Sequence, residues 1–429
     1  MFLTPSSTKP KERAAKHHSH HSLGPSIDEP SMQPPMPRGP VLGWDCFKRP
    51  NPAEKSELDT FPSVELLPHK TYTTSGRAAI YHALRQLQLV SGRLVLLPTY
   101  HCPTMVAPVL LAGHQPSYYG IAANGLPNLD SITPDQARLA GAMLVPHYFG
   151  IPHSLAEVRR WCDEHHIALI EDCAHTLFGR AGERNVGAWG DFATASLSKF
   201  LPVPEAGLLA SGQRPIAPLN LQEQGTKAHT KGCLDIVEMA IVHERLTGLN
   251  TIGNAILNIK LAIKRILRGK NTTPTASSNC RPESGDFMPA CDMARINFAP
   301  LGISLWLTRK LTRHNIIRRR RENFLLYAQL LNNQSGCRPL MPDSNTLSDQ
   351  CIAPYVFPLW VDDADRVYHE LRLHGYPVFR WDRIWPGTPI ISGDAGQQWS
   401  RHVLQLLCHQ DLQELDIKKT AAAIQHILN

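Results

Sequence analysis

The sequence predicts an α/β protein whose main sheet is mostly parallel and carries helices on both faces. The first observation is that strand-like runs alternate with amphipathic helical segments from residue 73 onward. The second is that the runs are strongly apolar, as in RLVLLPTY and AGAMLVPHYFG, which is typical of strands buried on both faces. The third is size: 429 residues, 42% of them hydrophobic, suffice for a large domain and a smaller one.

Each expected element follows from its local pattern. A helix is expected over 75–87, where Ser-Gly precedes apolar residues at helical spacing, and another over 154–166. The strands expected in the large domain are 93–100, 140–150, 167–172, 191–198 and 207–211. The elements expected in the smaller α/β domain are a long helix over 302–331, a strand over 355–361, a helix over 364–376, a strand over 377–382 and a closing helix.

These patterns divide the chain into four expected parts. Residues 1–40 are rich in Pro, Ser, Lys and His and lack periodicity, so we expect a disordered tail. Residues 41–230 form the large domain, 231–290 an inserted helical segment with a linker, and 291–429 a connecting helix with the small C-terminal domain. The histidines within 17–21 could bind a transition metal, but a solvated low-complexity tract is the favoured interpretation, and no metal site is predicted.

Two basic segments invite a surface-binding interpretation. Residues 234–270 show isoleucines at helical spacing with Lys and Arg between them. They could lie weakly on an anionic membrane as an amphipathic helix. The favoured alternative is an inserted hairpin that packs on a dimer or covers the active site. The four arginines of 318–321 lie within a long helix, where a solvated face is more typical than a nucleic-acid patch.

Composition limits the functional classes. The net charge of +7 is modest for this length; it fits anionic small molecules and gives no argument for nucleic acid. The ten cysteines are scattered without a C-x-x-C pair, which argues against a disulfide framework and suits the reducing cytoplasm. No apolar stretch reaches about 18 residues, so no spanning helix is expected. The N-terminus lacks the apolar segment of a signal peptide.

Two stretches could hold a phosphate and a cationic ring. TTSGRAA (73–79) opens a helix, and the free N–H groups there could cradle a phosphate, although a plain helix cap is the alternative. Asp172 ends an apolar strand, at the edge where open α/β sheets bind ligands. Its carboxylate could pair with a protonated ring nitrogen, such as that of pyridoxal phosphate, or could cap the next turn.

Lys199 follows a strand of small residues in SLSKFLPVPEAG. If partly desolvated, its amine has a lowered pKa and can react with an aldehyde cofactor, whereas an isolated lysine is more often a solvated surface charge. The hydroxyls of Ser196 and Ser198 could bind a phosphate beside it. The stretches 98–104 and 145–150 each place an aromatic ring and a histidine after a strand, either to stack on a planar cofactor or to pack in the core.

Taken in order, these features resemble the DegT/StrS family of sugar aminotransferases, which are fold-type I pyridoxal-phosphate enzymes. SGRAA is similar to that family's SGTAA, VPHYFG to its V-H-x-Y-G, and IEDCAH to its I-E-D-x-A-Q. GDF, SLSK and EAG are similar to its G-D, S-K and E-G-G. The resemblance runs from about Thr73 to the C-terminus with one interruption. It implies a seven-stranded, mostly parallel sheet in the large domain, a small C-terminal α/β domain, and a homodimer with the site at its interface.

The resemblance also implies roles for individual residues. Lys199 would bind the cofactor covalently and move the proton during the reaction, and Asp172 would pair with the ring nitrogen. His175 stands where the family usually has Gln, near the phenolic oxygen of the cofactor. The remaining contacts implied are the phosphate ligands Gly76, Arg77 and Ser196, and a ring-stacking residue near Tyr100 or His101.

Several positions depart from the family pattern. Arg77 replaces a small Thr in the phosphate turn, and the spacing from Ser196 to Lys199 is shorter than usual. EAG replaces E-G-G. The stretch closest to the family's G-x-N-x-R-M is ACDMARINF, with Asp292 at the arginine position. These departures bear on the sugar substrate more than on the cofactor chemistry.

The sequence therefore predicts a pyridoxal-phosphate aminotransferase. It would take an amino group from glutamate and pass it to a keto-sugar, most often nucleotide-linked, in surface polysaccharide or secondary-metabolite biosynthesis. One alternative is a sugar dehydratase of the same fold, but family members with that activity carry His where this chain has Lys199. The other is a non-catalytic homologue acting as a regulatory or assembly partner, against which Lys199 and Asp172 together argue.

Overall fold

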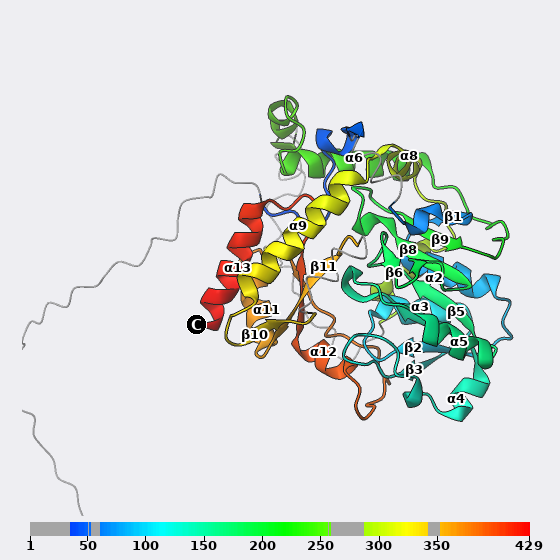
Figure 1. The fold of residues 1–429 in the computed structure, drawn as a ribbon. Coiled ribbons are helices and arrows are strands. Elements are labelled where there is room, and N and C mark those ends of the chain that lie inside the picture. The colour runs from blue at the N-terminus through cyan, green and yellow to red at the C-terminus, as the bar shows by residue number, and fades with distance from the viewer. Residues whose placement is uncertain (1–34, 50, 53–60, 256, 259–286, 342–351) are drawn as a thin grey trace, which may run out of the picture. The chain divides into compact units, whose positions relative to one another are not determined.

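The computed structural model describes residues 35–429 except 50, 53–60, 256, 259–286 and 342–351 (Figure 1). Most of the expected N-terminal tail, including its histidine tract, lies outside the described residues. So do the linker 271–286 and, within the inserted segment 234–270, residues 256 and 259–270. Residues 35–40 are described, and the carbonyl of Pro37 lies 3.0 Å from His409 Nε2. In the described part of the chain, no helix is long and apolar enough to cross a membrane.

A seven-stranded sheet has the order β1-β9-β8-β5-β4-β2-β3. Its strands are β1 (His69–Thr73), β2 (Leu94–Pro98), β3 (Gln115–Tyr119), β4 (Ala140–Pro146), β5 (Ala168–Asp172), β8 (Phe192–Ser196) and β9 (Gly207–Ser211). The strands from β3 through β8 pair in parallel, while β9 pairs antiparallel with both β8 and β1. The predicted mostly parallel sheet is confirmed.

Helices cover both faces of this sheet. They are α2 (Gly76–Gln86), α3 (Pro103–Leu111), α4 (Pro134–Leu139) and α5 (Ala156–Glu164). Neighbouring residues along a strand alternate between two apolar cores: Leu96 and Leu169 belong to one, Val95 and Ile170 to the other, which also contains α2 and α3. Burial on both faces explains why these strands are apolar throughout.

The C-terminal part builds a second sheet, which is antiparallel and has the order β10-β11-β13-β12. Its strands are β10 (Cys337–Pro339), β11 (Val356–Val361), β12 (Val378–Phe379) and β13 (Val403–Leu407). The associated helices are α9 (His314–Leu331), α11 (Ala364–Leu373), α12 (Gly396–His402) and α13 (Glu414–Leu428). Figure 1 shows α9 and α13 side by side, in agreement with their extensive contacts.

The long helix predicted over 302–331 is wrong in one respect, because it is two helices, α8 (Gly302–Lys310) and α9. Leu311 has an extended backbone, and the N–H of Thr312 donates to Cys46 O at 3.1 Å instead of continuing the helix. The Arg313 side chain then bonds to Leu311 O and to Glu65. A distant segment of the chain therefore breaks the helix, and the local sequence contains no signal for it.

Helix α6 (Thr226–Val242) packs against α8. The remaining described elements are short strands and 3-10 turns. They are the strands β6 (Arg180–Ala181) and β7 (Arg184–Asn185) and the 3-10 turns η1 (Trp44–Phe47), η2 (Val64–Leu66), η3 (Leu129–Ser131), η4 (Tyr148–Gly150), η5 (Leu197–Lys199), η6 (Pro289–Cys291) and η7 (Met293–Arg295).

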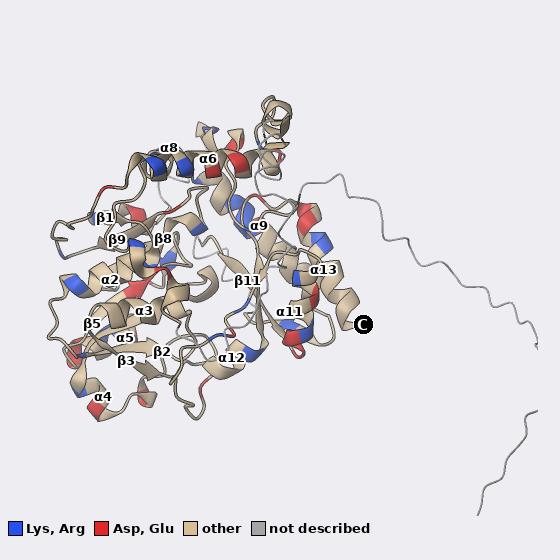
Figure 2. Ribbon diagram, turned by 180° about the vertical axis from the view of Figure 1, so that it is seen from behind, with Lys and Arg blue, Asp and Glu red and all other residues tan. Residues whose placement is uncertain are grey.

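The arginine run of α9 is not a uniformly solvated face. Figure 2 shows basic residues on α8 and α9. The side chain of Arg318 is about half exposed, at 49%, whereas Arg320 has no exposed surface. The expectation that the whole run is solvated is wrong for Arg320, because helical geometry turns this residue toward the core.

Candidate active site

A cavity of about 440 Å³ lies at the carboxyl ends of the parallel strands. Pro146, Asp172 and Ser196, the last residues of β4, β5 and β8, all line it. This is the edge of an open α/β sheet where ligands bind. The predicted site residues that line the cavity are Gly76, Arg77, Asp172, His175, Ser196 and Lys199. A second cavity, of about 330 Å³, contains none of the predicted site residues.

Lys199 ends the turn η5 directly after β8. Its Nζ lies 5.1 Å from the centroid of the Tyr355 ring, on the face of that ring. Burial lowers the pKa of the Lys199 amine, while the nearby Asp172 carboxylate opposes this shift. A larger fraction of the amine is therefore neutral than in a solvated lysine, and a neutral amine is the form that attacks an aldehyde.

Asp172 is almost fully buried, with 3% of its surface exposed. Its Oδ1 accepts hydrogen bonds from the Ala174 N–H at 3.0 Å and from Thr194 Oγ1 at 3.2 Å. Burial raises the pKa of the carboxyl, and the Lys199 cation and these two bonds lower it. Both hydrogen bonds from the described residues reach Oδ1, so Oδ2 is left for a cationic group in the cavity.

The phosphate turn forms the N-terminus of α2. The Ser75 side chain caps this helix by accepting from the Ala78 N–H at 3.3 Å. A Cβ built on Gly76 would lie 3.3 Å from Ser196 Cβ, so the turn approaches the end of β8 closely. A Cβ on Gly207 would lie only 2.2 Å from Ser75 O. The glycine of EAG is therefore required because β9 passes directly behind the turn.

Arg77 lines the cavity, but its guanidinium also contacts the segment that contains Cys291 and Asp292. It donates to the carbonyl of Cys291 and lies 3.9 Å from the Asp292 carboxylate. The segment 289–295 thus sits beside the phosphate turn of the same chain. Asp292, which replaces an arginine of the family pattern, compensates the charge of Arg77, which replaces a threonine.

His175 lies in an aromatic wall of the cavity. Its ring centroid is 4.4 Å from that of Tyr355 and 5.0 Å from that of Trp381. Burial lowers the pKa of His175 well below its ordinary value, and the Lys199 cation adds to the shift. The imidazole is therefore neutral, with one nitrogen able to donate a hydrogen bond and the other to accept one.

Tyr100 and His101 do not line the cavity. The Tyr100 ring is fully buried against Tyr148, Phe149, Trp381 and Trp399. Both nitrogens of His101 are used: Nδ1 lies 2.8 Å from Pro98 O, and Nε2 accepts from the Trp385 N–H at 2.9 Å. The chain turns sharply between β2 and α3, which directs these side chains into the core. The next residue, Cys102, faces the cavity instead.

Sequence reasoning missed Tyr355, Arg380 and Trp381, which also line the cavity. They come from the second sheet and the residues next to it, more than 150 positions after Lys199 in the sequence. No spacing pattern connects such distant residues to the lysine. The segments PYVFPLW and PVFRWD have the pattern of strands, and nothing in that pattern indicates a binding site.

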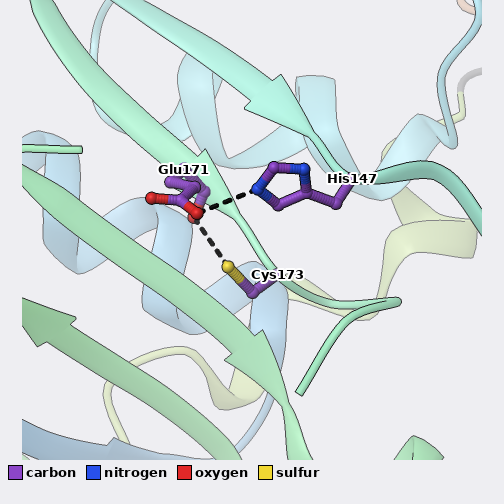
Figure 3. A group of neighbouring side chains, drawn as sticks. All are labelled: His147, Glu171 and Cys173. Carbon is purple, nitrogen blue, oxygen red and sulfur yellow. Dashed lines mark hydrogen bonds and ion pairs between the residues drawn. The ribbon is translucent and has the colours of Figure 1, made fainter. Parts of the chain in front are cut away.

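Glu171, beside Asp172, supports the site from the core side. His147 Nε2 donates to its Oε1 at 2.8 Å, as Figure 3 shows. The N–H groups of Gly187, Trp189 and Gly190 also donate to this carboxylate, at 2.6, 2.8 and 3.2 Å. The donor atoms of His147, Glu171 and Cys173 are close enough to hold a metal. Because N–H groups already occupy both carboxylate oxygens, we assign Glu171 to fixing the strand end and the His147 ring.

Comparisons with known proteins match the part of the chain that contains these residues. Residues 65–244, which contain Gly76, Asp172 and Lys199, match the model of the DegT/DnrJ/EryC1/StrS aminotransferase family. Similar proteins include a GDP-perosamine synthase of Vibrio cholerae, with 27% identity over 39% of this chain and 47% of that protein. The lipopolysaccharide biosynthesis protein RfbH of Salmonella typhimurium is 31% identical over 36% of this chain and 37% of its own. The matched region thus spans less than half the length of these relatives.

The similarity in fold covers more of the chain than residues 65–244. Helicobacter pylori PseC, an aminotransferase involved in pseudoaminic acid biosynthesis, superposes with a TM-score of 0.60 at 13% identity, over 92% of this chain and 99% of PseC. The aminotransferase TlmJ of Streptoalloteichus hindustanus gives 0.55 at 18% identity, over 84% and 86%. The fold is that of the fold-type I aminotransferases, so this prediction is confirmed.

Proposed function

We propose that this protein is a pyridoxal-phosphate-dependent aminotransferase acting on a keto-sugar, most often a nucleotide-linked one. The observation that carries the proposal is that Lys199 and Asp172 line one cavity beside the N-terminus of α2. A scaffold protein has no use for a buried lysine and a buried carboxylate in the same cavity, because taking two charges out of water is costly even when they are paired.

The residues fit this cofactor. Lys199 offers an amine with a lowered pKa for its aldehyde, and Asp172 offers a free carboxylate oxygen for its ring nitrogen. The N–H groups of Gly76 and Arg77, at the positive end of the α2 dipole, with the hydroxyl of Ser196 opposite, suit a phosphate. Pyridoxal phosphate, when bound, supplies an electron sink for the substrate carbon that exchanges its nitrogen.

The chain's own residues supply the rest. Asp172 holds a proton on the ring nitrogen by pairing with it in a water-poor environment. The Lys199 amine would move a proton to and from the substrate carbon. The neutral His175 can hydrogen-bond to the oxygen substituent of the ring, and Trp381 and Tyr355 exclude water around it.

The proposed substrates follow from the names of the relatives. Their names include a GDP-perosamine synthase and a UDP-N-acetyl-3-dehydro-alpha-D-glucosamine 3-aminotransferase. We propose glutamate as the amino donor and surface polysaccharide or secondary-metabolite biosynthesis as the process. We also propose a homodimer in the cytoplasm. Any weak peripheral membrane contact is proposed only through residues 234–270.

The experiment is a visible absorption spectrum of the purified protein with pyridoxal phosphate, beside Lys199→Ala and the surface control Lys227→Ala. We expect a yellow band in the unaltered protein and in Lys227→Ala, absent from Lys199→Ala, and bleached by glutamate. A protein that forms no band would contradict the proposal and favour a non-catalytic homologue. A band that glutamate does not bleach would retain the cofactor but exclude this donor.

A further inference from the structure

The second cavity, of about 330 Å³, borders the segment that carries Lys199 but shares no lining residue with the active-site cavity. Pro202 and Gln410 form one part of its wall, and residues of 311–319, from the end of α8 into α9, form another. Its volume lies at the lower end of the range for small-molecule sites. None of the roles proposed above uses this cavity, so we ask which ligand its lining suits.

Three arginines line the second cavity: Arg245, Arg318 and Arg319. The side chains of Arg318 and Arg319 are 49% and 28% exposed, and Arg245 is half-buried, so a ligand can reach all three. Toward the described part of the chain, Arg318 and Arg319 each donate two side-chain hydrogen bonds, and Arg245 donates one. A guanidinium has five N–H groups, so each arginine keeps donors for an acceptor in the cavity.

One carboxylate serves two of these arginines. Glu322 lies 2.8 Å from Arg318 and 2.9 Å from Arg319, each contact being made to a different carboxylate oxygen. The two guanidiniums therefore share a single negative charge. Exposed ion pairs of this kind contribute little to stability, which leaves both arginines available to a ligand at small cost.

A second carboxylate, Asp411, also has two cationic neighbours. Arg245 and the fully buried Arg320 both act to lower the pKa of the Asp411 carboxyl, against the effect of burial. The other carboxylate in the wall, Asp45, is paired with Lys48 at 2.6 Å. Among the described residues, four arginines thus have two carboxylates, which leaves an excess of two positive charges. A phosphate monoester, with a charge of about −1.5 to −2 at neutral pH, matches this excess.

The rest of the lining is polar. Thr312, Asn315 and Gln413 contribute a hydroxyl and two amide groups. These groups can both donate and accept hydrogen bonds, as the hydroxyls of a sugar require. The described lining contains no aromatic ring on which a nucleobase could stack. The cavity therefore suits a phosphorylated, hydroxyl-bearing molecule better than a nucleotide.

The wall of the second cavity is connected to the reactive lysine. Gln410 Nε2 donates to Phe200 O at 2.9 Å, and Gln410 Oε1 accepts from Arg320 Nε at 3.1 Å. Arg320 in turn donates to Lys199 O at 2.6 Å. Pro202, two residues after Phe200, lines the cavity itself. A ligand that displaces this wall therefore displaces the backbone that holds the Lys199 amine.

We propose that the second cavity binds a phosphate monoester of a hydroxylated small molecule, such as a sugar phosphate, and that its occupancy changes the reactivity of Lys199. Arg245, Arg318 and Arg319 would donate to the phosphate oxygens, since guanidinium groups bind phosphate through paired N–H donors. The effect on Lys199 rests on the proposed aminotransferase function, because it requires a reaction at that amine. The binding of the ligand does not rest on it.

The first test is calorimetric titration of the full chain with glucose 1-phosphate, with and without pyridoxal phosphate. Arg318→Gln should weaken binding by about 10- to 100-fold, because a charge-assisted hydrogen bond to the phosphate is lost. Its thermal midpoint should stay unchanged, since Arg318 is half exposed. Arg309→Gln, an exposed arginine of α8 outside the cavity, should bind like the unaltered protein.

Controls locate the ligand. Glucose, which lacks the phosphate, should not bind measurably, and equal affinity for glucose would contradict the charge argument. Arg77→Gln, in the active-site cavity, should bind glucose 1-phosphate like the unaltered protein. Weakened binding in Arg77→Gln but not in Arg318→Gln would place the ligand in the active site and overturn the proposal. No binding by the unaltered protein would also overturn it.

The second test is the rate at which the yellow band forms on mixing with pyridoxal phosphate. Glucose 1-phosphate, at a concentration that saturates only the unaltered protein, should change this rate at least twofold there and leave it unchanged in Arg318→Gln. Binding without any change in rate would overturn the effect on Lys199. Absence of the band from every protein, with binding that still depends on Arg318, would contradict the aminotransferase and leave the phosphate site standing.

Discussion

Arg320 Nη2 donates a hydrogen bond to the carbonyl of Lys199 at 2.6 Å. The same guanidinium bonds to Pro354 O at 3.1 Å and to Gln410 Oε1 at 3.1 Å, and it lies 4.4 Å from the centroid of the Phe200 ring. A single buried side chain of α9 thus fixes the turn that carries the reactive lysine and joins it to the segments before β11 and after β13. Arg320 is a positioning residue, since it acts on the cavity through Lys199.

Arg320→Ala should lower the free energy of unfolding by about 3 kcal/mol or more, because several buried carbonyls lose their donor. The measurement is chemical denaturation monitored by circular dichroism. The matched control is Arg318→Ala on the same helix. Loss of the partly exposed ion pair between Arg318 and Glu322 should lower the free energy of unfolding by less than about 0.5 kcal/mol. Equal losses in the two variants would show that Arg320 has no special structural role.

Asp172→Asn should separate stability from activity. Burial raises the pKa of this carboxyl, so replacing it with a neutral amide relieves a desolvation cost, and the thermal midpoint should stay level or rise. Amino transfer from glutamate should fall by about 100-fold or more, since the ring nitrogen loses its anionic partner. Single-turnover kinetics measure this loss. Thr194→Val, which removes one hydrogen bond to Asp172 but keeps its charge, should reduce the rate far less; a comparable loss in both would refute the charge argument.

Gly207→Ala should weaken cofactor binding. The added Cβ would lie 2.2 Å from Ser75 O, so the N-terminal turn of α2 must shift away from Ser196. We expect at least a tenfold higher dissociation constant for pyridoxal phosphate by absorbance titration, corresponding to about 1.4 kcal/mol. Gly212→Ala is the control, because the nearest atom to its added Cβ is 3.9 Å away. Unchanged affinity in Gly207→Ala would mean that the turn does not hold the phosphate.

His409 should make the protein sensitive to acid. Its Nε2 donates to Pro37 O at 3.0 Å, and its Nδ1 accepts from the Asp411 N–H at 3.3 Å, so both nitrogens are satisfied in the neutral ring. Burial lowers the pKa of His409 from 6.5 to about 3. Between these values the unfolded chain binds a proton that the folded chain does not. Stability is therefore full above pH 6.5 and is lost as the pH falls toward 3, by up to about 1.4 kcal/mol per pH unit.

The measurement is denaturant unfolding at several pH values for the unaltered protein and for His409→Gln. The variant should lose less stability on acidification. Asp411 has the opposite effect, because burial raises its pKa to about 6, but it is present in both proteins and cancels in the difference. His374→Gln, an exposed histidine, should keep the original pH dependence. Identical curves for His409→Gln and the unaltered protein would exclude this role for His409.

The sequence predicted the interior of the main sheet better than its edges. Strands β2, β4, β5, β8 and β9 were expected because burial on both faces makes them continuously apolar. The edge strands β1 and β3 were not, since HKTYT and QPSYY are polar where they meet solvent. Strand β13 was not expected either, although it is fully buried and lies between β11 and β12 in its sheet. The pattern of hydrophobic residues indicates which segments are buried. An edge strand has too few buried residues to be distinguished from a loop in this way.

The candidate site shows the same limit. Asp172, Lys199 and the turn at Gly76 were found because strand ends and helix starts leave local signals. We expected Tyr100 or His101 to stack on the cofactor. Neither residue lines the cavity, because a turn between β2 and α3 directs both rings into the core. Arg320 and Arg380 act only once distant segments have come together, and no spacing between them and Lys199 encodes that contact.

Lys199 is the residue to which we expect pyridoxal phosphate to attach. The most direct measurement is to reduce the protein–cofactor mixture with sodium borohydride, digest it and locate the added mass by peptide mass spectrometry. We expect one cofactor per chain, attached to Lys199 in the peptide containing SLSKF, and none in Lys199→Ala. Attachment spread over surface lysines, or no attachment to Lys199, would contradict it.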